Sequence, residues 1–407
     1  MRILIIAYYY PPMNTVGAIR PSKFCKYLPQ QGHKTGILTH AFDRTNFDTT
    51  NHIYRVYDLN KNGIHQLLNY PCKTAFRILN YAGIYRSRFS FWKDSIMKTS
   101  EKIINSFRPD ILFATFPPPE TLEVGVHLSE RYSIPLVSDF RDGLLFESLE
   151  NLGSNKPKRL KYEELEKRVA LRSSAIITVS DPITDYFRDK FSHPRAVTIP
   201  NGYDPEDYLN VSDISLDTSK LNIVYTGRLG NSDAGTNSNT LFSALAKLIN
   251  NSELAKSKIR LHMIGNFSSK EINNMEQLVK KQVIYIYGQM DRKSSLAYQR
   301  AADVLLLITS SNRTSVATGK LYEYLHAGKP ILALTHNTYG ATVIRQTNSG
   351  WIVDPQDEDG IIAILTQLAV DPLLPKSIHP DRSVIANYSR QKQTAKLSQV
   401  FEQILTP

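Results

Sequence analysis

Cysteine is scarce in this sequence, with only Cys25 and Cys72 among 407 residues. A chain of this length with so few cysteines is not held together by a disulfide framework, and a reducing cytoplasm is its expected environment. Neither cysteine has another cysteine or a histidine at the spacing of a metal-binding motif. We therefore expect both to be packing residues.

Long apolar runs are also missing. No stretch reaches the roughly 18 uncharged apolar residues that a membrane-spanning helix needs. The apolar run at residues 3–7 is too short for the core of a signal peptide, and no small-residue cleavage site follows it. We therefore expect a cytoplasmic protein, which can still bind peripherally to the inner face of the cell membrane.

Several catalytic signatures are absent as well. The sequence holds no G-x-x-x-x-G-K-[ST] loop, no G-x-G-x-x-G after the first apolar run, no G-x-S-x-G and no H-E-x-x-H. One D-x-D triplet is present, at residues 357–359, in a polar turn before an apolar segment. Capping of a helix at residues 361–368 explains this triplet better than metal binding does, and we expect no metal site.

Positive charge is present in excess, and it is local. The formal net charge is +11. The first 100 residues contain 14 basic and 4 acidic side chains, whereas the remaining 307 contain 35 basic and 34 acidic. A protein that wraps nucleic acid along its length spreads its basic residues more widely, so we expect no nucleic-acid partner.

Residues 59–100 interleave aromatic and basic side chains. One interpretation is a helical insertion that packs on a domain and leaves a solvated basic face. The other is an interfacial segment at residues 66–98, with aromatic side chains in the headgroup layer and cations facing an anionic membrane surface. The sequence leaves both open.

Short apolar runs alternate with segments of helical period along the chain. The runs lack strict polar alternation, which is typical of strands buried on both faces of a parallel sheet. This order predicts two doubly wound α/β domains, and a chain of 407 residues is long enough for both. A turn-rich stretch at residues 199–205 and a polar segment at 211–220 mark their junction. Strands are predicted at residues 3–7, 35–39, 111–115, 135–139, 175–179, 196–200, 221–225, 259–264, 283–287, 304–308, 331–334 and 350–353, and helices at 20–30, 118–132, 158–172, 240–250, 294–301 and 320–327.

In the first half, the candidate site residues follow predicted strands, because ligands of open α/β sheets bind at the carboxyl ends of the strands. Gly17 precedes a predicted helix, where a glycine lets a ligand approach the backbone, although a turn is the commoner reason for one. Asp139, Arg141 and Asp142 follow the strand at 135–139. They form either a capping and salt-bridge cluster or a wall that binds sugar hydroxyls.

In the second half, Arg228 follows the strand at 221–225. It is either an exposed turn residue or a phosphate ligand. Gly265 and Gly288 each follow or end a predicted strand, where exposed backbone can bond a nucleobase edge or simply make a turn.

The most informative stretch is 302–330. A helix that starts near Thr318, Gly319 and Lys320 presents free N–H groups and a positive dipole end that suit a diphosphate, and Lys320 adds a charge. Glu323 lies one turn further in, where its carboxylate can accept two bonds from a ribose diol. The alternative is a helix whose Lys320 and Glu323 are merely exposed.

Several short segments, in their order and spacing along the chain, resemble motifs of the family 4 glycosyltransferases of the GT-B fold. The similarity extends from residue 1 to about residue 404. Two segments, Phe-Pro-Pro-Pro at 116–119 and Asp-Phe-Arg-Asp at 139–142, are similar to the branch that acts in bacterial surface polysaccharide synthesis. The others are the donor-site signature at 320–330, Tyr-Thr-Gly-Arg-Leu at 225–229, Pro-Asn-Gly at 200–202, Ala-Asp at 302–303, and Tyr-Tyr-Pro-Pro at 9–12 with Gly17 and Arg20.

The resemblance implies two Rossmann-like domains that face a central cleft. Residues 1–205 would form the acceptor-side domain and residues 215–385 the domain that binds a nucleotide-diphosphate sugar. A closing helix at 386–405 would pack back on the first domain. The family usually needs no metal or other cofactor and retains the anomeric configuration. The donor-binding residues would be Gly17, Arg228, Gly265, Gly288, Thr318, Gly319, Lys320 and Glu323, and the catalytic candidates on the acceptor side Asp139, Arg141 and Asp142.

Two positions depart from the family pattern. The first Glu of its Glu-x7-Glu motif would fall at Ser315, and that Glu usually contacts the transferred sugar. The family also often has a Lys about five residues after the position of Arg228, where this chain has Asp233. The donor sugar is therefore open, and the diphosphate charge would be met by Arg228, Lys320 and helix dipoles.

The function expected from all this is a retaining glycosyltransferase. It would move a hexose-type sugar from a nucleotide-diphosphate sugar to a hydroxyl of a glycan or lipid-linked glycan in surface polysaccharide synthesis. The alternatives are a sugar-nucleotide epimerase of the same fold, a glycosyltransferase acting on a small soluble acceptor, and a non-catalytic sugar-nucleotide or nucleic-acid binder.

Overall fold

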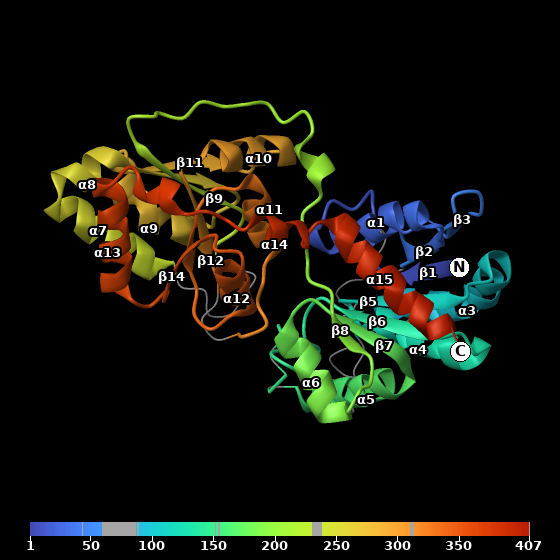
Figure 1. Ribbon diagram of the computed structural model, residues 1–407. Helices are drawn as coiled ribbons and strands as arrows, with labels where there is room; N and C mark the ends of the chain where they lie inside the picture. Colours follow the sequence, from blue (N-terminus) through green and yellow to red (C-terminus); the bar gives the residue numbers. More distant parts are fainter. Residues whose placement is uncertain are drawn as a thin grey trace. The chain divides into compact units, whose positions relative to one another are not determined.

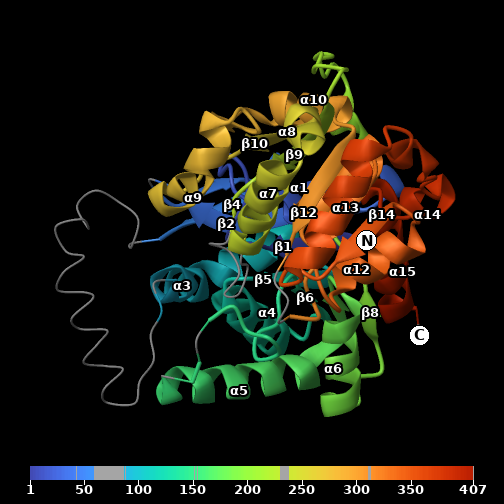
Figure 2. The same ribbon diagram turned by 90° about the vertical axis from the view of Figure 1, so that its left-hand side faces the viewer.

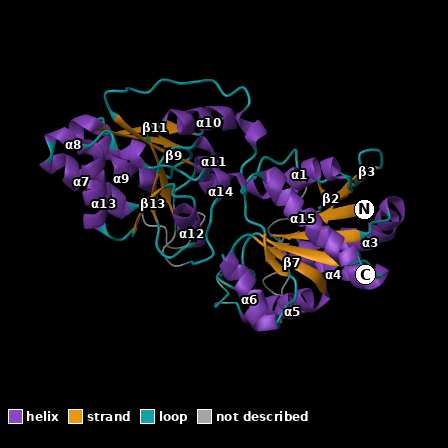
Figure 3. Ribbon diagram, viewed as in Figure 1, coloured by secondary structure: helices purple, strands orange, loops and turns teal. Residues whose placement is uncertain are grey.

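A computed structural model describes residues 1–42, 44–58, 87, 89–150, 152–153, 155–229, 238–309 and 313–406. The chain divides into two compact units (Figure 1). Unit 1 comprises Met1–Pro200 and Gln393–Pro407, and unit 2 comprises Asn201–Lys392. Each unit is built on one sheet with helices around it (Figure 3). The predicted fold class, two doubly wound α/β domains, is confirmed.

Unit 1 contains an eight-stranded sheet in the order β3-β4-β2-β1-β5-β6-β7-β8. Neighbouring strands are parallel except for the antiparallel pair β3 and β4. Prediction missed β3 and β4, because β3 has only three residues and β4 is a short strand in which only alternate residues are buried. The strands are β1 (Arg2–Ile6), β2 (Lys34–Ala41), β3 (Asn46–Asp48), β4 (Ile53–Tyr57), β5 (Ile111–Phe116), β6 (Leu136–Phe140), β7 (Ser173–Thr178) and β8 (Ala196–Thr198).

Helices cover both faces of this sheet. On one face, helices α3, α4, α5 and α6 pack against a core that includes Leu4 and Ile6 of β1. On the other, α1 and α15 pack against a core that includes Ile3 and Ile5 (Figure 1). This two-sided burial explains why the run of β1 is apolar without alternation. The helices are α1 (Val16–Tyr27), α3 (Ser90–Phe107), α4 (Pro119–Tyr132), α5 (Lys156–Arg172), α6 (Asp181–Phe191) and α15 (Arg390–Leu405), with the short η1 (Pro29–Gln31).

Helix α3 corrects part of the interfacial interpretation of residues 66–98. Most of that segment lies outside the described residues. Within α3, Trp92 is fully buried, with its ring centroid 5.1 Å from that of Tyr8. Lys93 pairs with Glu123 of α4, with Nζ and Oε2 2.6 Å apart. Trp92 and Lys93 therefore hold α3 to the domain, and the enclosed Trp92 ring is not free to enter a headgroup layer.

Unit 2 contains a six-stranded parallel sheet in the order β11-β10-β9-β12-β13-β14. Counted from β9, this is the 3-2-1-4-5-6 order of Rossmann sheets. The strands are β9 (Leu221–Thr226), β10 (Ile259–Ile264), β11 (Ile284–Gly288), β12 (Val304–Ile308), β13 (Ile331–Leu334) and β14 (Gly350–Val353).

The helices of unit 2 also form two layers. One layer packs on the core that contains Ile223 and Leu306, and α7 and α13 lie in front of the strands in Figure 2. The other packs on the core that contains Val224 and Leu305. The first layer is α7 (Asn239–Asn251), α8 (Glu253–Lys258), α9 (Ser269–Lys280) and α13 (Glu358–Val370); the second is α10 (Arg292–Ala301), α11 (Gly319–Ala327), α12 (Tyr339–Gln346) and α14 (Arg382–Ala386), and η2 (Pro205–Tyr208) and η3 (Leu374–Ser377) complete the unit.

The D-x-D triplet caps a helix, as predicted. The side chain of Asp357 accepts a hydrogen bond from the backbone N–H of Gly360, at 2.9 Å, at the start of α13. A carboxylate at this position also interacts favourably with the positive end of the helix dipole.

Candidate functional site

The strand order of unit 2 creates a topological switch point beside β9. The chain leaves β9 toward β10 on one side, while β12 lies on the other side. Loops after such strands diverge and leave room for a ligand at the carboxyl edge. Gly227 and Arg228 follow β9, and the segment that leads into α11 follows β12. Predicted site residues from the loop after β9 and from the segment that leads into α11 therefore lie at the same edge of the sheet.

Glycines after β9 and β10, Gly227 and the predicted Gly265, fit the backbone together at this edge. The N–H of Gly227 donates to the carbonyl of Ile264, and the N–H of Gly265 donates to that of Gly288, each at 2.8 Å. Both Gly227 and Gly265 have positive φ, and a Cβ on Gly265 would lie 1.9 Å from the carbonyl oxygen of Gly227. Glycine is required there because any side chain would separate the two loops. Around Gly288 the Cβ position is open, but its φ of +70° still favours glycine.

Lys320 lies against the loop after β9. Its Nζ donates to the hydroxyl of Tyr225 at 2.9 Å and sits 4.1 Å from the centre of that ring. A Cβ on Gly227 would be 3.0 Å from the same Nζ. The Tyr225 hydroxyl in turn donates to the carbonyl of Arg228, whose side chain is exposed. Two cations, one from each side of the switch point, therefore border the same edge.

Helix α11 adds a positive dipole end. Thr318 precedes the helix in an extended conformation, and its first turn contains no acidic residue. Thr318 Oγ1 is buried and has no hydrogen-bond partner among the described residues. The first-turn N–H groups of a helix lack intrahelical partners, so they suit an anion. Thr318, Gly319 and Lys320 lie at this helix start, as predicted.

Glu323 is not merely exposed, because α10 holds its carboxylate. Oε1 accepts from Arg292 Nη1 at 2.9 Å, and Oε2 accepts from Gln299 Nε2 at 3.3 Å. Arg292 also pairs with Asp207 of η2, at 2.9 Å. Sequence reasoning missed Arg292 and Gln299. The signal available was Asp291, which caps α10 and places Arg292 inside a helix predicted to begin two residues later.

Arg141 of unit 1 stabilises the backbone. Its guanidinium donates to the carbonyls of Phe116 and Pro117, at 3.0 and 2.7 Å, and to that of Gly17. Burial lowers the pKa of Arg141 below its usual value. A Cβ on Gly17 would lie 2.9 Å from the ring of Tyr9. The Arg141 side chain therefore ties the first turn of α1 to the end of β5, at the switch point beside β1.

The structure corrects the role predicted for Asp139 as part of a sugar-binding wall. Asp139 is fully buried, and its carboxylate accepts from Arg20 Nη2 at 2.8 Å and from Thr115 Oγ1 at 2.7 Å. Arg20, itself 2% exposed, also donates to the carbonyl of Pro200 at 3.0 Å. A carboxylate enclosed in this way cannot line a surface, so the salt-bridge interpretation holds for Asp139. Asp142, two residues beyond β6, is half-buried and remains an acceptor-side candidate.

Within the part of the chain that the structure describes, no group of three or more His, Cys, Asp or Glu side chains is placed to hold a metal ion. None of the described helices is both long enough and apolar enough to cross a membrane.

Fold and switch points together define a two-unit α/β protein of the GT-B architecture. Residues 22–207 match the model of Glycosyltransferase Family 4, and residues 220–371 match that of Glycosyl transferases group 1. The chain belongs to the family 4-like glycosyltransferases, and it is an enzyme of that class.

Solved structures share the fold at low sequence identity. Sucrose-phosphate synthase from Thermosynechococcus elongatus matches with a TM-score of 0.71 and 14% identity, over 99% of this chain and 98% of that one. The HepE protein of Anabaena, solved in complex with UDP and glucose, matches with a TM-score of 0.61 and 14% identity, over 99% and 100%. A comparison with curated protein sequences finds no match.

Proposed function

We propose that this enzyme is a retaining glycosyltransferase that uses a nucleotide-diphosphate sugar. The observation that carries the proposal is the convergence of Arg228, Lys320 and the start of α11 at the switch point of a Rossmann-ordered sheet. A diphosphate needs several cationic or N–H donors at short range, and these elements supply them without a metal ion. Glu323 lies one turn along α11, where a ribose diol would follow the diphosphate.

In this mechanism the charge that grows on the departing diphosphate is the main target of stabilisation. Lys320, Arg228 and the N–H groups of α11 are oriented before reaction, so little reorganisation is needed at the transition state. We assign no side chain as general base, and the leaving phosphate takes the proton of the acceptor hydroxyl. Ser315 stands where the family has a sugar-binding Glu, so the donor sugar loses one carboxylate contact there.

The proposed acceptor is a glycan or lipid-linked glycan of a surface polysaccharide. The confinement of excess positive charge to the first 100 residues supports a cytoplasmic enzyme that binds the inner face of the membrane. If the protein does not float with anionic vesicles, the proposed binding to the membrane is wrong. A small soluble acceptor is the second candidate, supported by the similarity to sucrose-phosphate synthase. Epimerisation is disfavoured because both family models describe glycosyltransferases.

Nucleotide binding tests the donor site. UDP, GDP, ADP and CDP are titrated while thermal unfolding is followed, and one of them at 100 times its Kd should stabilise the protein by about 2.7 kcal/mol. Lys320→Ala should weaken that Kd by roughly 10- to 100-fold, because a charge-assisted hydrogen bond contributes about 1.5–3 kcal/mol.

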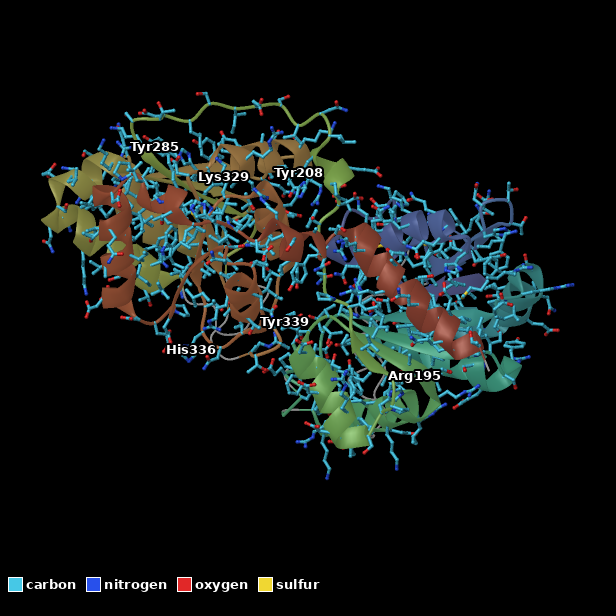
Figure 4. All side chains as sticks on the ribbon, viewed as in Figure 1. Arg195, Tyr208, Tyr285, Lys329, His336 and Tyr339 are labelled. Carbon is cyan, nitrogen blue, oxygen red and sulfur yellow. The ribbon has the colours of Figure 1, made fainter. Side chains whose placement is uncertain are left out.

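The matched control is Lys329→Ala, which removes the same charge just beyond the other end of α11 (Figure 4). It should leave the Kd within about twofold. No stabilisation by any of the four nucleotides, or equal losses in the two variants, would contradict the donor site. NMR of the sugar released from a panel of nucleotide sugars then reports the anomer, and release of the inverted anomer as first product would contradict retention.

A further inference from the structure

Gln299 is a buried polar side chain that packing alone does not explain. It lies on α10 and is 0% exposed. Its amide Oε1 is buried with no hydrogen-bond partner among the described residues. Burying an amide with an unpaired oxygen costs free energy, and an apolar side chain of similar volume avoids that cost.

The amide nitrogen of Gln299 joins two elements of the donor edge. Nε2 lies 3.1 Å from Oγ1 of Thr226, the last residue of β9, and 3.3 Å from Oε2 of Glu323. Thr226 is itself held by Tyr324, whose hydroxyl accepts from the Thr226 N–H at 3.0 Å. The amide nitrogen of Gln299 is therefore held from two sides, by the sheet through Thr226 and by α11 through Glu323.

We propose that Gln299 is a positioning residue that orients the Glu323 carboxylate toward the ribose of the bound nucleotide; this rests on the proposed donor site. Each carboxylate oxygen accepts about two hydrogen bonds. Arg292 occupies one position on Oε1 and Gln299 one on Oε2. Among the described residues no other hydrogen bond to these two oxygens is seen, which leaves one position on each, and a vicinal diol presents two hydroxyl donors.

Arg292 and Gln299 differ in how firmly they hold the carboxylate. The Arg292 side chain is 44% exposed and shares its charge between Glu323 and Asp207. Because the Arg292 guanidinium is open to solvent, these ion pairs are partly screened and hold the Glu323 carboxylate less firmly than an enclosed contact does. Gln299 is enclosed, and its hydrogen bond to Oε2 restricts the plane of the Glu323 carboxylate.

The test separates recognition of the ribose from general stability. UDP, GDP, ADP and CDP and their 2′,3′-dideoxy counterparts are titrated by calorimetry into the full-length protein. Wild-type protein should prefer the ribose form. Gln299→Met, which keeps the volume and removes the amide, should weaken binding of the ribose form about tenfold. It should leave the dideoxy form within twofold. In a Glu323→Ala background, Gln299→Met should cause no further loss.

Controls keep the outcome readable. Arg300→Gln alters an exposed residue of the same helix and should bind like wild type. Gln299→Asn, whose shorter amide cannot reach Glu323, replaces the Met variant if that one does not fold. Equal losses for ribose and dideoxy forms, or additive losses with Glu323→Ala, would overturn the positioning role and leave the donor site standing. Absence of binding of every nucleotide to wild type would overturn both.

Discussion

Arg20 and Asp139 form an ion pair enclosed in unit 1. Arg20 is 2% exposed and Asp139 is fully buried, and their closest atoms are 2.8 Å apart. The pair links α1 to the end of β6, while Arg20 also holds the carbonyl of Pro200. Removing one partner of such a pair leaves the other charge desolvated and uncompensated.

Asp139→Asn should therefore destabilise unit 1 by about 3–5 kcal/mol, because Arg20 keeps its charge and loses its counter-ion. Urea unfolding followed by circular dichroism measures this change. Asp142→Asn is the control, since Asp142 is half-buried and lies two residues beyond the same strand. If the two variants differ by less than 1 kcal/mol, the structural role of Asp139 is wrong.

Among single residues, Arg228, Lys320 and Glu323 could be located from sequence, because each follows a recognisable strand or starts a recognisable helix. The roles of Asp139 and Arg141 could not be predicted from the sequence. Whether a charged side chain lines a surface or closes a buried cluster depends on Arg20 and on carbonyls more than twenty residues away in sequence.

At the scale of elements, strands β9, β10 and β11 are linked by a polar chain through His262. Its Nε2 is 3.1 Å from Asn222 Oδ1 on β9, and its Nδ1 is 2.9 Å from the hydroxyl of Tyr287 on β11. The ring also stacks at 17° to that of Tyr285, which is half-exposed on the edge strand (Figure 4). Burial, aided by Arg260, lowers the pKa of His262 from 6.5 to about 4.

This lowered pKa has a consequence for stability. Between pH 6.5 and 4 the unfolded chain binds a proton at this residue and the folded chain does not, so stability falls as the pH falls. The contribution of His262 to this loss is about 3 kcal/mol. His262→Gln should reduce the slope of unfolding free energy against pH in that window. An unchanged slope between pH 6.5 and 4.5 would contradict the buried neutral imidazole.

Strands with continuous apolar runs were predicted well, whereas short or largely polar elements were not. All six strands of unit 2 were located within one or two residues. Helices α6, α9 and α12 were missed, since their sequences mix polar and apolar residues and only one face is buried. Their stability comes from the sheet they cover, which a local window of sequence does not contain.

At the scale of the whole molecule, each unit has cores of its own on both faces of its sheet. The chain passes from unit 1 to unit 2 after Pro200 and returns at Gln393. Leu397, Val400 and Phe401 of α15 then join the core of unit 1. Each unit therefore buries enough apolar surface to unfold as a cooperative body.

Differential scanning calorimetry should accordingly resolve two transitions. A nucleoside diphosphate that binds the donor edge should raise the transition of unit 2, because a ligand stabilises only the folded form that it binds. Asp139→Asn should lower the temperature of the transition of unit 1. A single transition that moves with both changes would show that the units unfold together.

The sequence by itself determined the two α/β units, the strand ends at which ligands bind, and the helix start with Lys320 and Glu323. These follow from apolar periodicity and local turn chemistry, which short windows of sequence carry. Only the tertiary structure decided that Asp139 and Arg141 serve the scaffold, that Trp92 belongs to the core, and that Gln299 and Arg292 hold Glu323. Burial and hydrogen-bond partnership arise from residues that are distant in sequence, and the free energy of a charged or polar group depends on both.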